Sequence, residues 1–365
     1  MRRRLLIVLS LGWIFNYVHR MIVPPLIPLI KVEFGINNAQ AGLLMTSLLL
    51  PYALIQVPAG YLGDRFGRKR VLVMSILGYS LSSALMLFGR NYWHVIGFRA
   101  LYGLFAGLYY APATALISEV YGRKKGSALG LFMVGPPVGS GLAPLIALPV
   151  ALSLGWRWAF VVTSIASALI GLALLFGVRC DTKRGEKAKA TIPRHLLPLG
   201  VANFAILAAF FATLTFLPDF FVSMGRSVEE ASLYFSALSI AGIAGSLGGG
   251  ALYDRLGRKS TEMAIGLTAL LILLLTVSTL PQVVPILGVF FYAIGPIVTA
   301  YTAELATDEN RGSVMGFVNM AGFFGATVGP YSLGLLIDAF GYKMAFLALP
   351  ALYLLALGII MKEKR

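Results

Sequence analysis

The chain has 365 residues, of which 58% are hydrophobic and only 12% are charged, and its formal net charge is +15. Soluble domains carry about a quarter charged residues, mixed along the chain, whereas here the charges occupy short segments between long apolar stretches. A helix of about twenty residues crosses the hydrocarbon layer of a membrane. The composition therefore excludes a soluble globular domain and predicts an all-α polytopic membrane protein.

Twelve apolar segments are expected to be transmembrane helices, six on each side of one long polar loop. They lie near residues 5–30, 39–62, 71–89, 94–117, 126–150 and 157–178, and near residues 196–222, 230–253, 261–280, 283–305, 313–338 and 344–361. We expect an N-terminal bundle at 1–178, a cytoplasmic linker at 179–195 and a C-terminal bundle at 196–365. The first segment is too long for the apolar core of a signal peptide and is expected to be retained.

The distribution of Lys and Arg predicts the orientation. With the N-terminus in the cytoplasm, 23 of the 30 basic residues fall on the inner side and five in the outer loops, as the positive-inside rule requires. We therefore expect a multi-pass protein of a prokaryotic plasma membrane with both termini cytoplasmic. The same distribution explains the net charge by topology and attraction to anionic lipid, so no nucleic-acid partner is expected.

The two halves of the chain repeat one another. The segment DRFGRK that begins at Asp64 returns as DRLGRK at Asp254. The two copies are 190 residues apart (254 − 64), and we call this spacing the first offset of the repeat. Further along, LGWRWAF from Leu154 matches FGYKMAF from Phe340. These copies are 186 residues apart (340 − 154), and we call this spacing the second offset. An even number of helices per repeat makes the repeats parallel, with a pseudo-twofold axis along the membrane normal.

The loop GYLGDRFGRKR after the second segment resembles the signature G-x-x-x-D-R-x-G-R-[KR] of the major facilitator superfamily, and a degenerate copy, GALYDRLGRKS, follows the eighth segment. The resemblance covers nearly the whole chain. It implies a secondary transporter of two six-helix bundles that works by rocker-switch alternating access, usually as a monomer. We expect no enzymatic activity, no cofactor and no metal site.

The two charged loops are expected to form a conformational latch at the cytoplasmic helix ends. Asp64 can face the positive end of a helix dipole, and Arg68 can pair with a carboxylate such as Glu119. A basic anchor for the membrane topology is the alternative, but it does not explain the two aspartates. The latch residues are expected to be Gly60, Asp64, Arg65, Gly67, Arg68 and Glu119, with Gly250, Asp254, Arg255, Gly257 and Arg258 in the second copy.

Ionisable residues inside the apolar segments indicate the substrate site. Arg20 lies about 22 Å along the first helix, and burying an arginine there costs at least ~2.5 kcal/mol; we expect it to bind an anion, with snorkelling to the outer headgroups as the alternative. Asn16 shares its helical face. His19 stands where the organic-anion branch of the superfamily often has Asp, which leaves open whether His19 titrates or the substrate carries the charge.

Arg99 in the fourth segment either binds substrate or donates hydrogen bonds to carbonyl groups of the first helix, and Tyr102 shares its face. The second half has no ionisable residue at mid-membrane, so its lining is expected to be neutral. The expected substrate residues are Asn16, His19, Arg20, Arg99, Tyr102, Tyr234 and Asn319. Close packing or hinge bending is expected at Gly103, Gly107, Gly135, Pro136, Gly139, Gly325, Gly329 and Pro330.

These residues predict a secondary carrier that moves a small organic anion, such as a carboxylate, with or without protons as the coupling ion. The alternative is a proton-coupled exporter of amphipathic drugs with the same fold. The remaining expected partner is the lipid bilayer.

Overall fold

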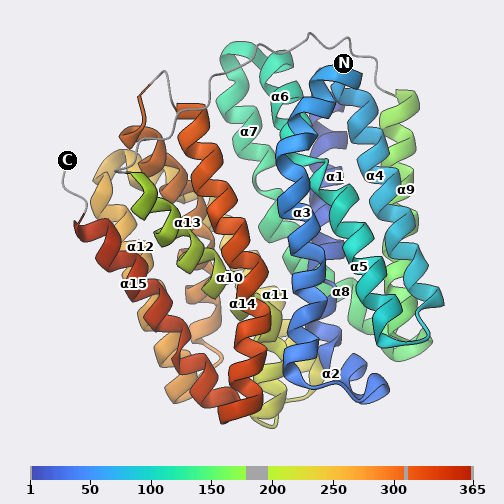
Figure 1. The fold of residues 1–365 in the computed structure, drawn as a ribbon, viewed down its shortest axis with the longest axis vertical. Coiled ribbons are helices and arrows are strands. Elements are labelled where there is room, and N and C mark those ends of the chain that lie inside the picture. Colours follow the sequence, from blue (N-terminus) through green and yellow to red (C-terminus); the bar gives the residue numbers. More distant parts are fainter. Residues whose placement is uncertain (1, 178–195, 308–310, 363–365) are drawn as a thin grey trace. The chain divides into compact units, whose positions relative to one another are not determined.

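The computed structural model describes residues 2–177, 196–307 and 311–362, and every regular element in this part of the chain is helical (Figure 1). Residue contacts divide the chain into two compact units. Unit 1 comprises Met1–Gly35 and Ser47–Glu186, and unit 2 comprises Ile36–Thr46 and Lys187–Arg365. The first residues of the second predicted helix thus group with unit 2, although residues 1–178 were expected to form one bundle. The expected linker at 179–195 lies outside the described residues.

Unit 1 holds the first six predicted membrane segments, apart from the start of the second, which belongs to unit 2. Its helices are α1 (Arg2–Met21), α2 (Val23–Phe34), α3 (Asn38–Phe66) from Ser47 onward, α4 (Arg68–Ala84), η1 (Leu85–Phe88), α5 (Tyr92–Gly107), α6 (Tyr110–Tyr121), η2 (Gly122–Lys124), α7 (Lys125–Phe132), α8 (Gly135–Leu154) and α9 (Trp156–Gly177).

Three of the predicted continuous segments in unit 1 are broken. The first separates into α1 and α2, the fourth into α5 and α6, and the fifth into α7 and α8. A proline follows each of these breaks, and a proline has no N–H to donate and its ring clashes with the preceding turn. Pro24 and Pro25 open α2, Pro112 lies in the first turn of α6, and Pro136 and Pro137 open α8.

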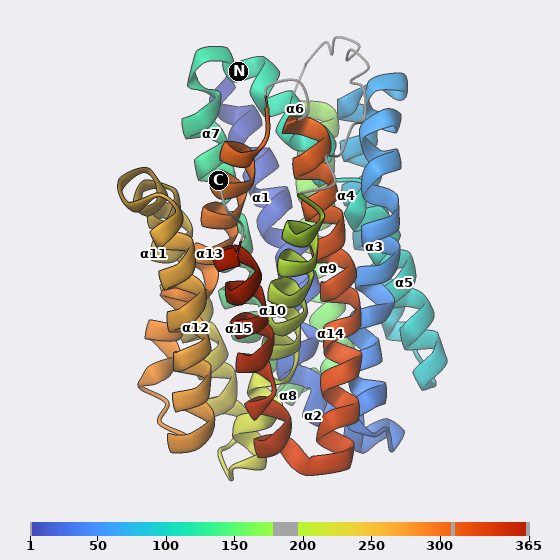
Figure 2. The same ribbon diagram turned by 60° about the vertical axis from the view of Figure 1, so that its left-hand side comes forward.

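Unit 2 contains Ile36–Thr46 with α10 (Leu197–Ser223), α11 (Val228–Leu256), α12 (Arg258–Ser278), α13 (Val283–Leu305), α14 (Arg311–Leu347) and α15 (Leu349–Lys362). In Figures 1 and 2, α10 runs beside α14 and α15. Gly341 has a non-helical backbone, with φ of 77°. The end of α14 after Gly341 and α15 together therefore supply the twelfth segment.

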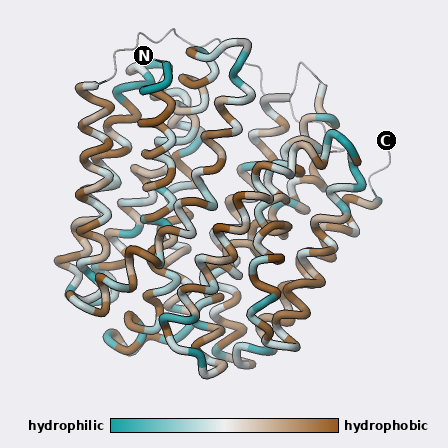
Figure 3. The backbone as a smooth tube through the Cα atoms, turned by 180° about the vertical axis from the view of Figure 1, so that it is seen from behind, coloured by the Kyte–Doolittle hydropathy of each residue, from teal (hydrophilic) through white to brown (hydrophobic). Residues whose placement is uncertain are grey.

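Eleven helical stretches among the described residues are each long and apolar enough to cross a membrane, and α15 is a shorter apolar helix. Hydrophobic residues follow the lengths of the helices and hydrophilic residues gather toward their ends (Figure 3). The predicted fold class, twelve membrane segments arranged as six and six, is confirmed.

The internal repeat is also visible in the packing of the two units. A side chain at Gly139 of α8 would collide with the Ile14 carbonyl of α1, and one at Gly325 of α14 would collide with the Phe204 carbonyl of α10. The two glycines are separated by the second offset, and the two carbonyl groups by the first offset. Both offsets therefore relate equivalent positions in space, and helices at these positions approach closely because glycine has no side chain.

Candidate functional site

The first membrane segment is interrupted where the expected substrate residues lie. Because Pro24 and Pro25 have no N–H, the carbonyl groups of Arg20 and Met21 lack the helical donors that would come four residues later. Accordingly α1 ends at Met21, and α2 starts shortly after it, at Val23. The break leaves backbone carbonyl groups that need other donors.

Arg99 of α5 supplies such donors. Its side chain is 1% exposed; Nη1 donates to the His19 carbonyl at 3.1 Å and Nη2 to the Arg20 carbonyl at 3.4 Å. Both bonds go to the end of α1. Of the two roles that the sequence left open for Arg99, this geometry favours the structural one: the guanidinium holds the interrupted helix in place.

Arg20 lies at the break with its guanidinium between two tyrosine rings. The side chain is fully buried, and its guanidinium carbon is 4.4 Å from the centre of the Tyr17 ring and 4.2 Å from that of Tyr52. Nη2 donates to the amide oxygen of Asn16 at 3.2 Å. Nε and Nη1 have no hydrogen-bond partner among the described residues. The site is therefore a buried cation with unused donors.

Asn16 and Tyr102 orient this site. The Tyr102 hydroxyl donates to the Asn16 carbonyl at 2.6 Å, and the Asn16 amide nitrogen donates to the Ala106 carbonyl at 3.2 Å. With its nitrogen held in this way, the Asn16 amide presents its oxygen to Arg20. Asn16, Arg20, Arg99 and Tyr102 thus form one connected cluster.

His19 points to a different part of unit 1. Its Nε2 lies 3.0 Å from the Ser167 hydroxyl, and its Nδ1 lies 2.8 Å from the Ser83 hydroxyl and 3.3 Å from that of Thr163. These hydroxyls belong to α4 and α9, and the imidazole is fully buried. The side chain ties α1 to these helices through both ring nitrogens, so the geometry favours a packing role over a substrate contact.

The candidates from the second half lie in unit 2. The Tyr234 ring packs against Phe221 with ring centres 4.8 Å apart, and Asn319 is exposed on α14. The hydroxyls of Thr213 and Thr215 donate to carbonyl groups of their own helix, α10. As expected, no charged side chain is buried among the described residues of this unit except Asp219, near the end of α10.

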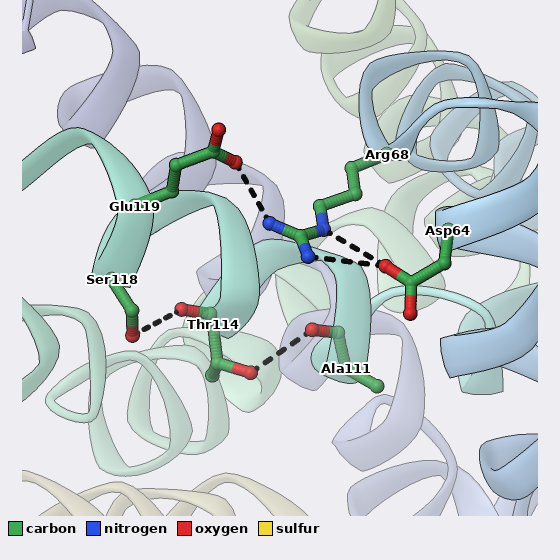
Figure 4. Close-up of polar contacts among 6 residues, drawn as sticks. All are labelled: Asp64, Arg68, Ala111, Thr114, Ser118 and Glu119. Atoms are coloured by element: carbon green, nitrogen blue, oxygen red, sulfur yellow. Dashed lines mark hydrogen bonds and ion pairs between the residues drawn. The ribbon is translucent and has the colours of Figure 1, made fainter. Parts of the chain in front are cut away.

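The first predicted latch loop forms a compact ionic cluster (Figure 4). Arg68 donates from Nε and Nη2 to Asp64 Oδ1 at 3.3 and 3.1 Å, and from Nη1 to Glu119 Oε2 at 2.8 Å. It thereby joins the ends of α3, α4 and α6. Arg65 instead contacts the Tyr61 hydroxyl at 3.3 Å. Gly67 adopts a φ of 93°, which disfavours any residue with a side chain.

The second latch loop is connected differently. Arg258 donates to Glu262 on its own helix at 3.0 Å and to the Ile360 carbonyl of α15 at 2.6 Å. Glu304 accepts a hydrogen bond from Tyr253 at 2.5 Å. Asp254 is exposed and makes no recorded bond within the described residues. Arg258 thus joins the start of α12 to the end of α15.

The predicted packing glycines contact neighbouring backbones. Gly103 and Gly107 of α5 lie against the carbonyl groups of Leu48 and Tyr52 in α3. In unit 2, Gly329 lies against the Ala208 carbonyl of α10. Unlike the segment around Pro136, the segment around Pro330 continues as one helix.

Tyr17 and Tyr52 are the site residues that the sequence reasoning missed. Tyr17 precedes Arg20 by three positions and so shares its helical face, which was a readable signal. Tyr52 belongs to α3, and only the fold brings it to Arg20.

Comparison with known proteins agrees with this architecture. The profile of the Major Facilitator Superfamily matches residues 9–295 and 199–364. The hexuronate transporter of Bacillus subtilis is 25% identical over 93% of this chain and 89% of its own length. The gentisate transporter of Corynebacterium glutamicum is 28% identical over 92% of this chain and 82% of its own length.

A crystal structure of a bacterial homologue of the human lysosomal transporter Spinster, in an inward-facing and occupied conformation, superimposes with a TM-score of 0.86. It covers 98% of this chain and 96% of its own chain at 16% identity, a level at which the likeness supports the fold alone. The chain belongs to the Major Facilitator Superfamily.

Proposed function

We propose that this protein is a secondary carrier for a small organic anion and that Arg20 binds the carboxylate of the substrate. The observation that carries the proposal is the state of the Arg20 guanidinium. It is fully buried in a membrane-spanning helix, and two of its three nitrogens have no hydrogen-bond partner among the described residues.

A charge buried without an opposite charge is unfavourable. A carboxylate supplies both the missing acceptors and the missing charge, through charge-assisted hydrogen bonds. The rings of Tyr17 and Tyr52 both contact the guanidinium through cation–π interactions. These contacts leave the N–H donors of Nε and Nη1 for an anion.

The names of the relatives support the same class of substrate. Hexuronate and gentisate both carry a carboxylate, and both named transporters align over nearly the whole chain. We further propose alternating access as the transport mechanism, with the Arg68 cluster as a latch at the cytoplasmic helix ends.

Uptake of a panel of carboxylates into proteoliposomes tests the proposal, with and without a pH gradient. Arg20→Gln is expected to weaken uptake about 10- to 150-fold, the value of a hydrogen bond to a charged group. Arg20→Lys should retain part of it, because lysine keeps the charge but lacks the planar fork. Arg90→Gln is the control, since it removes the same charge at an exposed position. Unchanged uptake by Arg20→Gln would contradict the proposal.

The second candidate, a proton-coupled exporter of amphipathic drugs, predicts a different result in the same vesicles. Amphipathic dyes would move down an imposed pH gradient, and Arg20→Gln would leave that movement intact. A panel in which carboxylates alone move would exclude the exporter.

The proposed orientation places both termini and the 179–195 linker in the cytoplasm. Cys180 is the single cysteine of the chain, so the natural protein has one site for labelling by thiol reagents. A membrane-impermeant maleimide should modify Cys180 in inverted vesicles and leave it unmodified in intact cells. Labelling of Cys180 in intact cells would show that the linker lies outside, opposite to the proposed orientation.

A further inference from the structure

Three oxygen atoms meet in unit 2 near the end of α10. The Tyr342 hydroxyl contacts Oδ2 of Asp219, and it also lies 2.8 Å from Oδ1 of Asn38. Asp219 is 4% exposed. Tyr342 follows the bend of α14 at Gly341, and Asn38 begins α3 in the part that belongs to unit 2.

The orientation of the Asn38 amide is fixed by its other end. Its Nδ2 donates to Asp338 Oδ1 at 2.7 Å, so this atom is the amide nitrogen and the opposite atom is the oxygen. The backbone N–H groups of Asn38 and Ala39 also donate to the Asp338 carboxylate, at 3.0 and 2.8 Å. Asp338 thus faces three N–H donors at the start of α3, and the Asn38 oxygen faces Tyr342.

If Asp219 is ionised, the contacts among Asp219, Tyr342 and Asn38 have one proton too few. A phenol has one O–H proton, yet the Tyr342 hydroxyl lies within hydrogen-bond distance of two oxygens that would both be acceptors. One proton on Asp219 supplies the missing hydrogen bond, because Asp219 then donates to Tyr342 and Tyr342 donates to Asn38. We propose that Asp219 is a proton-binding site whose proton is held by the hydrogen-bonded chain Asp219–Tyr342–Asn38.

The equivalent position in unit 1 shows a different arrangement. In the match of LGWRWAF with FGYKMAF, Tyr342 corresponds to Trp156, whose Nε1 donates to Glu33 at 2.6 Å. Arg157 donates to the same carboxylate at 3.0 and 2.6 Å. Glu33 is therefore met by N–H donors and a cation, as an ionised carboxylate requires. The repeat thus holds an ion pair in unit 1 and a hydroxyl chain in unit 2.

Loss of the proton changes the contacts of α3. An ionised Asp219 competes for the single Tyr342 proton, and the stronger acceptor is the carboxylate. Asn38 then loses its donor, which weakens the attachment of the α3 start to α14. Thr46 donates to the Thr327 carbonyl of α14 at 2.6 Å and holds the other end of this short stretch. Protonation of Asp219 therefore tightens the contact of residues 38–46 with α14.

Other ionisable groups surround this end of unit 2. Lys343 beside Tyr342 and Arg226 in the turn after α10 are exposed, and Glu230 is held in the capping box that begins α11. The remaining groups on the neighbouring helices at this end are Asp338 on α14, Glu229 and Tyr234 on α11, and Tyr353 on α15. Tyr342 makes a direct hydrogen-bond contact with Asp219.

The proton site stands on this geometry alone, whereas a role in coupling rests on the proposed function. Because both ring nitrogens of His19 lie against hydroxyl groups, Asp219 is the better candidate for the coupling proton. The Arg distribution predicts that its end of α10 faces outside, the side from which a proton enters in symport.

Infrared spectroscopy of the full chain in liposomes, without any substrate, tests the site. Asp219→Asn should remove a protonated-carboxyl band from the wild-type spectrum, and Tyr342→Phe should shift that band because the partner of the carboxyl group changes. Glu229→Gln, at an exposed carboxylate of α11, is the control and should leave the band in place. Asp219→Glu keeps the carboxyl group and should shift the frequency of the band without removing it. This variant tests the proposal even if Asp219→Asn fails to fold. An identical carboxyl region in the wild type and in Asp219→Asn would overturn the proposal.

A second measurement follows the start of α3, with Ala39→Cys in a Cys180→Ser background. Ala39 is 5% exposed, so its labelling by maleimide reports release of this stretch. Relative to acidic pH, alkaline pH should raise the rate about fivefold beyond the rise of a free thiol control, the value of one neutral hydrogen bond. Adding Asp219→Asn should abolish the excess, and an excess that survives it would also overturn the proposal. Neither readout uses carboxylate uptake, so failure of the proton site is distinguishable from failure of the proposed function.

Discussion

Arg20 in α1 and Phe210 in α10 occupy equivalent positions of the repeat, since they are separated by the first offset. Arg20 is a buried cation between tyrosine rings. Phe210 stacks on Phe291 with ring centres 4.1 Å apart and meets Tyr292 edge-on at 5.5 Å. The two units share a backbone scaffold and its glycine contacts, but the charged interior belongs to unit 1. Recognition of an anion is therefore expected to depend on unit 1 far more than on the matching positions of unit 2.

The largest expected effect comes from Arg99. Arg99→Met leaves the carbonyl groups of His19 and Arg20 without their donors, and each buried unsatisfied carbonyl costs about 1–3 kcal/mol. We expect a large loss of thermal stability in detergent and the loss of carboxylate uptake. Arg90→Met, at an exposed position, should stay within about 0.5 kcal/mol of the wild type. A variant as stable as the wild type that fails to take up carboxylates would instead make Arg99 a substrate ligand.

Replacement of Arg20 should have the opposite effect on thermal stability from replacement of Arg99. Arg20→Met removes a buried charge that no carboxylate of the described residues pairs with, and replacing such a charge by an apolar side chain is often neutral or stabilising. We expect thermal stability to be kept or raised while carboxylate binding is lost. Thermal unfolding with and without substrate measures both effects. A marked loss of stability would show that Arg20 serves the fold rather than the cargo.

The fold was predictable from the sequence because membrane helices have a strong signal. Length, apolarity and the distribution of Lys and Arg locate twelve segments, and the repeated loop motif relates the halves. The breaks within segments were less visible. Pro24 and Pro25 indicated the break in the first segment, and Pro112, in the first turn of α6, has no N–H to donate to Leu108 at the break between α5 and α6.

The site was only partly predictable, because a sequence shows which residues share a helix but not which helices meet. Arg20 and Asn16 were found together since they are one turn apart. Tyr52 and the Asp219–Tyr342–Asn38 chain come from separate helices that only the fold assembles. His19 was expected at the substrate site because the His19–Arg20 pair resembles the Asp-Arg pair of the organic-anion branch. Its ring instead contacts hydroxyls of α4 and α9, since adjacent residues of a helix point in different directions.

The two latch loops offer a smaller effect and a matched pair of variants. Asp64 is bound by Arg68, whereas Asp254 is exposed and makes no recorded bond within the described residues. Asp64→Asn is expected to change the rate of carboxylate exchange by about 1.4- to fivefold, since partly exposed ion pairs are worth about 0.2–1 kcal/mol. Asp254→Asn should change it less. Equal effects of the two variants would mean that the loops act through their charge alone.

The smallest effect on transport is expected at Phe210. Phe210→Leu removes a stacked aromatic pair worth about 0.5–1.5 kcal/mol, so stability should fall slightly. Carboxylate affinity should stay unchanged, because an aromatic stack contributes neither charge nor a hydrogen-bond donor to an anion. Competition between carboxylates of different shape measures this in the same vesicles as Arg20→Gln. A loss of affinity comparable to that of Arg20→Gln would mean that the two equivalent positions act together on the substrate, and anion recognition would then belong to both units.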